Sequence, residues 1–354
     1  MKGIPLTLSR PTPLLAGVVL LLAVAAAYLN SLHGAFVWDD FPTIVQNPAI
    51  EHFASALRRP ADVNTASGRP LVGLSLALNY ALGGRNPVGF HLFNLLVHAA
   101  AALALFGFVR RLALLPRWAG RFAPHATGLA LGVAAVWALH PLQTQAVTFI
   151  VQRAESLMGL CYLLTLYLFL RAADSPRPGL WRALAVAACA LGMTAKEVMV
   201  SAPVVVLLFD RTFLAGSFRQ ALAAKKRFYG ALFGTWLILG WLVVNLGGNR
   251  DGSTGGFSPH AAWGAYWLTQ FPAVATYLKL AFFPHPLIFQ YGEFWLPNAT
   301  AAVPGALVVV PLVALTAVAL VRWPEAGFLG FWFWSILAVT SVMPGTVDMI
   351  VEYR

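Results

Sequence analysis

The chain has 354 residues, of which 59% are hydrophobic and only 10% are charged, and its mean hydropathy is +0.72. Because about a quarter of the residues in ordinary globular chains are charged, these values exclude a water-soluble enzyme, a disordered protein and a nucleic-acid binder recruited by a basic surface. They predict an all-α polytopic membrane protein. The net charge of +11 then reports how basic residues are divided between the two faces of the membrane.

Apolar runs of about 20 residues, the length needed to cross a bilayer, predict about nine transmembrane helices. They lie at residues 13–30, 91–109, 126–140, 156–171, 182–195, 198–214, 229–247, 303–321 and 326–343. The first run also fits a signal peptide, because Lys2 and Arg10 precede it and small residues occupy 25–27. We take it as a membrane span.

The distribution of charge predicts the orientation of these spans. With the N-terminus in the cytoplasm, and with a turn of slack at each edge, five segments hold 15 of the 24 Lys and Arg residues. They are 1–12, 110–125, 172–181, 215–228 and 322–325. Most acidic residues fall on the other side, so the positive-inside rule is satisfied. The Ala-, Arg- and Gly-rich composition suggests a bacterium, hence an inner membrane with the acidic side in the periplasm.

Two long outer segments, 31–90 and 248–302, belong to the single domain predicted for residues 1–354. Long loops are often functional. Part of the second segment, 261–291, is nearly apolar enough for a further span, but Pro272, Pro284 and Lys279 interrupt it. We therefore predict helices that lie at the outer interface or re-enter from it.

Adjacent carboxylates, Asp39 and Asp40, lie just outside the first span. Two such groups at a membrane edge disfavour each other's charge, which raises one pKa. Either carboxylate is suited to act as a general base toward a hydroxyl or to bind a divalent metal such as Mg²⁺ or Mn²⁺. The competing interpretation is a helix cap at the interface.

Polar residues in the second span, His91, Asn94 and His98, share one helical face. They are expected to face the bundle interior or a cavity, and packing is favoured over metal ligation because no acidic partner lies on the same helix. The next polar group, HPLQTQAVTFIVQRAES, begins at His140 and contains Arg153 and Glu155. Arg153 is suited to bind a phosphate bidentately or to pair with an acid.

Lys196 and Glu197 follow at the tight turn between the fifth and sixth spans. They are candidates for the functional site, and the competing interpretation is a salt bridge that closes a helical hairpin. Together with Arg69 they add charge to the outer side. Acids and bases on one side of a helical bundle are typical of an enzyme that acts on an anionic, membrane-borne substrate, of which a polyprenyl phosphate is an example.

Four segments of the chain carry a resemblance to a known family: FVWDD…IVQNPAI, SGRPLVGLSLALNYALGGRNPVGFHLFNLLVHA, ALHPLQTQAVTFIVQRAES and AKEVMVSAPVVVLLFD. In this order they resemble the transmembrane O-mannosyltransferases that carry tetratricopeptide repeats, and their bacterial relatives. These belong to glycosyltransferase superfamily C. The resemblance covers roughly residues 33–210, with weaker echoes in YLKLAFFPHPLIF and in the terminal EYR. The repeats are absent here, so we expect a fragment or a shortened member.

The resemblance implies a helical bundle with interfacial helices in the first outer loop and an active site on the outer side. It also implies inverting transfer of a hexose, mannose-like, from a polyprenyl-phosphate donor to a hydroxyl of a protein Ser or Thr or of an envelope glycan or lipid. Asp40 is favoured as the base over Asp39, with metal dependence left open. The candidate residues for binding the phosphate of the donor are Arg153, Lys196, Arg69 and Arg354. The candidate residues for lining the site are His140, Glu155, Glu197, His91, Asn94 and His98.

Two other classes compete with a transferase. A flippase or transporter of lipid-linked sugars also has polar residues facing a cavity, but it places charges near mid-membrane and needs no general base. A membrane scaffold predicts no dependence on single carboxylates. The acids of this chain cluster at one interface, which favours the transferase, and no nucleic acid is expected as a partner.

Overall fold

The computed structural model describes residues 12–57, 66–245, 263–289, 291, 295–296 and 298–342. Its helices are α1 (Pro13–Tyr28), α2 (Phe53–Ala56), α3 (Pro70–Gly83), α4 (Pro87–Ala113), α5 (Pro116–Phe122), α6 (Ala126–Ala138), α7 (Gln143–Thr148), α8 (Arg153–Arg171), α9 (Pro178–Met193), α10 (Ala202–Phe209), α11 (Phe218–Gly234), α12 (Trp236–Asn245), α13 (Trp263–Phe282), α14 (Val303–Arg322) and α15 (Pro324–Val342). Short 3₁₀ and π turns join several of them, and these residues contain no strand. The all-α prediction is confirmed.

Proline and capping residues determine where the long helices begin. In α4, the Asn86 side chain accepts a hydrogen bond from the Val88 amide at 3.1 Å, and Pro87 occupies the first helical position. Proline suits that position because its φ is already helical and the missing N–H has no partner there in any case. Arg110 and Arg111 in the last turn favour the negative end of the helix dipole.

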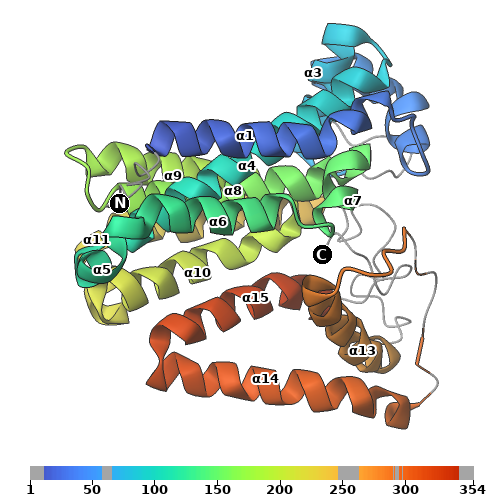
Figure 1. Cartoon of the computed structure of the whole chain (residues 1–354). Helices are drawn as coiled ribbons and strands as arrows, with labels where there is room; N and C mark the ends of the chain where they lie inside the picture. The colour runs from blue at the N-terminus through green and yellow to red at the C-terminus, as the bar shows by residue number, and fades with distance from the viewer. Residues whose placement is uncertain are drawn as a thin grey trace, which may run out of the picture.

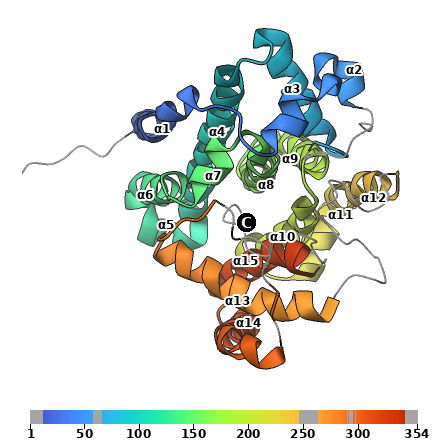
Figure 2. The ribbon, with the colours of Figure 1, turned by 90° about the vertical axis from the view of Figure 1, so that its right-hand side faces the viewer.

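A bundle of roughly parallel and antiparallel helices, α1, α4, α6, α8, α9 and α10, forms the main body of the structure (Figure 1). Figure 2 looks along this bundle. Helix α8 contacts α4 and α9, and α4 also contacts α6. The α6 surface that faces inward is a stripe of buried alanines at four-residue spacing, Ala126, Ala130, Ala134 and Ala138. Small residues of this kind let membrane helices approach closely.

Seven helical segments are long and apolar enough to cross a membrane: Pro13–His33, Pro87–Ala113, Ile150–Arg171, Glu197–Ala215, Phe218–Asn245, Ala299–Arg322 and Pro324–Val342. Leu22, Leu237, Leu307 and Val321 on their outer faces are 64% to 79% exposed, as expected for side chains in contact with lipid. The other two predicted spans coincide with α6 and α9, which have only 13 and 16 residues. By length and composition, the described residues therefore contain two fewer spanning helices than predicted.

The two predicted outer segments contain short helices. The first holds turns at Phe41–Val45 and Pro48–Glu51 together with α2 and α3, all near one end of the bundle (Figure 1). In the second, the residues predicted to lie at the interface or to re-enter form α13, which continues through Pro272 and is not among the seven candidate spans.

Helices α14 and α15 form an antiparallel hairpin beside the main bundle (Figure 2). Phe328 on α15 is buried against Phe209 and Phe213, with ring centroids 5.6 and 5.3 Å apart. At Gly327 the two helices touch so closely that a Cβ atom would lie 2.4 Å from the Leu320 amide nitrogen. Only glycine fits this contact.

Replacing Gly327 with alanine should therefore separate α14 from α15. Because the neighbouring atoms belong to the backbone, relaxation is costly, and we expect a loss of about 1–3 kcal/mol. Thermal unfolding of the purified protein in detergent would measure it. Gly240→Ala in α12, where a Cβ meets no atom within 4 Å, is the matched control, and an equal loss in both variants would contradict the close-contact explanation.

Candidate functional site

Asp40 is buried at the end of the bundle where α1 leaves and α8 begins. Its side chain is 1% exposed. One carboxylate oxygen accepts a hydrogen bond from the Val37 amide at 3.0 Å, and the other accepts one from the Val151 amide at 3.1 Å. The carboxylate thus ties the first outer loop to the turn that precedes α8.

Burial raises the pKa of Asp40 to about 6, and the neighbouring Asp39 adds to the rise, whereas the two amide hydrogen bonds and the positive charge of Arg153 lower it. Raised carboxylate pKa values are common at functional sites. The side chain of Asp40 has little contact with solvent, however, and both of its oxygens are occupied. An acceptor hydroxyl would reach it only if the loop moved.

Asp39 occupies the opposite face of the same turn and is exposed. The preceding residue, Trp38, has a φ of 46°, a left-handed conformation that residues other than glycine seldom adopt. The turn places Asp40 inward and Asp39 and Trp38 outward. The turn therefore leaves the Asp39 carboxylate at the surface and encloses that of Asp40.

The guanidinium of Arg153, at the first position of α8, is fully buried. It donates hydrogen bonds to the Asn94 Oδ1 at 2.8 Å, to the Phe90 carbonyl at 3.0 Å and to the Ser75 Oγ at 3.3 Å. The Phe93 ring centroid lies 4.4 Å from the guanidinium carbon. These contacts join α3, α4 and α8, so Arg153 occupies a structural position rather than one open to a phosphate.

The three polar residues of α4 are all buried, as the shared face predicts. Asn94 donates to the Val147 and Ile150 carbonyls at 3.4 and 3.2 Å in addition to its bond with Arg153. His98 bonds to the Ala138 carbonyl at 2.9 Å and stacks on Trp137. His91 lies against Gly34. These contacts favour packing for Asn94 and His98.

Two charged pairs meet where α9 turns into the 3₁₀ segment Glu197–Ser201. Lys196 forms a buried ion pair with Glu155 of α8, and Arg69, just before α3, lies 3.7 Å from Glu197. Lys196 and Glu197 were also interpreted as closing a helical hairpin with a salt bridge. In the structure each of them contacts an oppositely charged residue on another element. Four of the predicted site residues are brought together in this way.

A cavity of about 210 Å³ lies between α8 and α15 beside this ion pair. Its polar lining consists of His98, Gln143, Glu155, Ser156 and Thr340. His140 is half-buried, and its Nδ1 accepts a hydrogen bond from the Leu142 amide at 3.2 Å. Arg354 lies outside the described residues and remains a sequence prediction. Within the described ranges, no three His, Cys, Asp or Glu side chains form a group able to hold a metal ion.

The sequence interpretation missed two contributions to the site. Ser75, which bonds to Arg153, carries no recognisable signal in an apolar helix. Phe289 lies against the first loop: its ring centroid is 6.1 Å from that of Trp38 and 5.1 Å from that of Phe149, and its carbonyl accepts a hydrogen bond from Gln145 at 3.0 Å. The only hint was the similarity noted for the segment that contains FFPHPLIF.

The fold and its seven apolar helices define the chain as an all-α polytopic integral membrane protein. It is similar to the protein O-mannosyl-transferase Tmtc2 of Drosophila melanogaster, with 32% identity over 295 residues that cover 77% of this chain and 30% of the relative. Tmtc1 of the same organism is 35% identical over 42% of this chain and 18% of its own length. Human TMTC4 is 30% identical over 52% of this chain and 28% of its own length. No family model and no solved structure matches.

The chain thus spans less than a third of the length of these relatives. All three are named protein O-mannosyl-transferases. The chain belongs to the family of these relatives, and the predicted relationship to the transmembrane O-mannosyltransferases is confirmed.

Replacing Arg153 with methionine should leave three buried acceptors on two helices without their donor. Breaking a buried charged network by removing one partner typically costs about 3–5 kcal/mol, so we expect the protein to lose a large part of its thermal stability. Arg177→Met, at an exposed position, is the matched control. Full stability of Arg153→Met would show that the guanidinium does not hold the helices together.

The Lys196–Glu155 pair should behave as one energetic unit. In a double-mutant cycle with Lys196→Met and Glu155→Gln, either single change leaves a buried charge without its partner, whereas the double change removes both charges. We expect a coupling free energy of roughly 2 kcal/mol in thermal or denaturant unfolding. Additive losses would mean that the two side chains contribute independently.

Proposed function

We propose that this chain is a membrane glycosyltransferase that moves a hexose, mannose-like, from a polyprenyl-phosphate donor to a hydroxyl group of a protein or envelope acceptor. The observation that carries the proposal is the pair of carboxylates in the first loop, one exposed and one buried, within a chain similar to protein O-mannosyl-transferases. The reaction would take place on the side that this loop faces, which is the periplasm if the chain lies in a bacterial inner membrane with its N-terminus in the cytoplasm.

In this mechanism Asp39 acts as the general base. Its carboxylate takes the proton of the acceptor hydroxyl while the hydroxyl oxygen attacks the anomeric carbon of the donor. The bond from that carbon to the phosphate oxygen breaks on the opposite face, so the configuration inverts and polyprenyl phosphate leaves with the bonding electrons. The exposure of Asp39 supports this role better than the buried position of Asp40.

Asp40 is a positioning residue in this proposal. Its two amide hydrogen bonds fix the turn that carries Asp39 against the start of α8. Lys196 and Arg69 lie at the same end of the bundle, each beside a carboxylate, and in this proposal they turn from those carboxylates to the departing phosphate, whose charge they stabilise. Arg153 supports these elements from inside the bundle and is not proposed to touch the donor.

Sugar transfer in reconstituted membranes tests the assignment of the two carboxylates. With a radiolabelled polyprenyl-phosphate mannose and a Ser/Thr peptide, Asp39→Asn should lose about 100-fold to 10,000-fold in rate because it removes the base. Asp40→Asn should lose about tenfold to a hundredfold because it displaces the base without removing it.

Glu51→Gln changes a half-buried carboxylate that pairs with Arg85 in the same outer segment, and it should retain the wild-type rate. Full activity of Asp39→Asn would reject Asp39 as the base. If the wild type transfers nothing from any donor while lipid-linked sugar still changes leaflets, the transporter class replaces the transferase.

The pKa of Asp40 predicts how activity depends on pH. Above pH 6 its carboxylate is ionised and accepts both amide hydrogen bonds, and below pH 6 a proton occupies one oxygen and weakens the turn. Activity should therefore rise between about pH 5 and pH 7 with a midpoint near 6. Asp40→Asn should remove this midpoint while leaving residual activity, and an unchanged profile in that variant would assign the midpoint to another group.

A further inference from the structure

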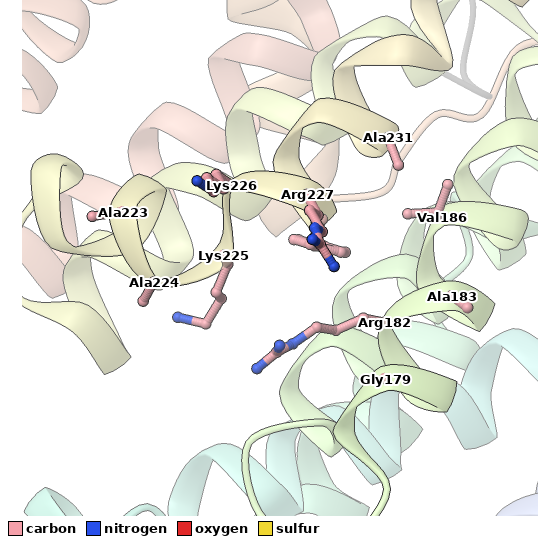
Figure 3. Close-up of a pocket in the computed structure, with 11 residues that line it drawn as sticks. Gly179, Arg182, Ala183, Val186, Ala223, Ala224, Lys225, Lys226, Arg227 and Ala231 are labelled. Carbon is pink, nitrogen blue, oxygen red and sulfur yellow. The ribbon is translucent and has the colours of Figure 1, made fainter.

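A second cavity lies at the opposite end of the bundle from Asp40, between α9 and α11 (Figure 3). Helix α8 runs away from Asp40 to Arg171, and α9 begins after it at Pro178, so the start of α9 is distant from the first loop. The cavity has a volume of about 620 Å³. Its lining is basic and apolar: Gly179, Arg182, Ala183, Val186, Ala223, Ala224, Lys225, Lys226, Arg227, Phe228 and Ala231.

One of its four cations is already neutralised. Lys225 donates to both carboxylate oxygens of Asp210, at 3.0 and 2.9 Å, and Asp210 is fully buried and also accepts a hydrogen bond from the Tyr229 hydroxyl at 2.6 Å. The helical dihedral angles of α11 break at Lys225, where φ is −134° and ψ is 31°. The break and the ion pair together fix the shape of this wall.

The other three cations, Arg182, Lys226 and Arg227, form no ion pair with any residue that the structure describes, and no described acidic side chain lines the cavity. Arg182 extends from α9 and Arg227 from α11 into the shared space (Figure 3). The Nε of Arg182 is buried, yet no acceptor among the described residues bonds to it. Buried donors normally have partners, so the Arg182 guanidinium is available to bind an anionic group.

Its remaining wall suits hydrocarbon. Ala183 and Val186 of α9 and Phe228 and Ala231 of α11 contribute apolar side chains to it. A free phosphate would fill only a small part of about 620 Å³ and would leave this surface uncovered. A ligand that joins a phosphate to acyl chains would use both.

We propose that the cavity between α9 and α11 binds an anionic glycerophospholipid, with the phosphate held by Arg182 and Arg227 and the acyl chains lying along the apolar wall that Val186 and Phe228 form. Arginine suits this role because its planar guanidinium bonds to phosphate oxygens in a bidentate manner. Basic pockets between membrane helices are known to hold lipid headgroups. The site is independent of the proposed sugar transfer at the other end of the bundle.

Lipid binding to the purified full chain tests this proposal. Phosphatidylglycerol and phosphatidylcholine would each be titrated onto the delipidated protein in detergent, with bound lipid counted by native mass spectrometry. We expect a preference for phosphatidylglycerol that weakens about fivefold for each cation removed, hence about 25-fold in the double variant Arg182→Gln, Arg227→Gln. Arg219→Gln, an exposed change on α11 outside the cavity, should bind like the wild type.

The single variant Arg227→Gln changes an exposed side chain and keeps the test valid if the double variant does not fold. Equal binding of the two lipids by the wild type, or an equal loss in Arg219→Gln, would overturn the proposal. Glycerol 3-phosphate is the competitor that separates the two sources of phosphate. If it displaces phosphatidylglycerol at similar concentrations, the cavity is a site for soluble phosphate esters and the lipid assignment fails.

Discussion

The buried guanidinium of Arg153 is the interaction on which the outer end of this protein depends. A full positive charge in an apolar bundle is tolerated only when its donors are satisfied. Two helices supply the three acceptors: Ser75 from α3, and Asn94 and the Phe90 carbonyl from α4. Because α8 begins at this residue, the same contacts fix the preceding turn. That turn presents the Val151 amide to Asp40.

Asp40 and Arg153 therefore form successive layers of one arrangement. Arg153 bonds to α3 and α4 and so fixes the turn before α8. The Val151 amide in that turn bonds to Asp40, whose carboxylate in turn fixes the first loop. The exposed Asp39 is the outermost member. A base whose position is set by packed helices loses little freedom when substrate arrives, which is how preorganised sites gain rate.

Much of this organisation is legible in the sequence. Hydropathy located seven segments that the structure confirms as long apolar helices, and the 3.6-residue period placed His91, Asn94 and His98 on one buried face. The residues that these side chains contact in the folded structure could not be predicted from the sequence. Whether Arg153 meets a phosphate or an asparagine depends on how α3, α4 and α8 cross, and no local pattern encodes that crossing. For the same reason the adjacent aspartates looked alike in the sequence, although the turn exposes the carboxylate of Asp39 and buries that of Asp40. Apolar runs also predicted spans at α6 and α9, which have 13 and 16 residues.

Phe289 contacts the first loop although about 250 residues separate it from Trp38 along the chain. A membrane protein is inserted as it is synthesised, with N-terminal elements first. The aspartates of the first loop thus enter the membrane system long before the segment that lies against them has been made. The surroundings of the first loop are therefore completed only after the segment that contains Phe289 has been made.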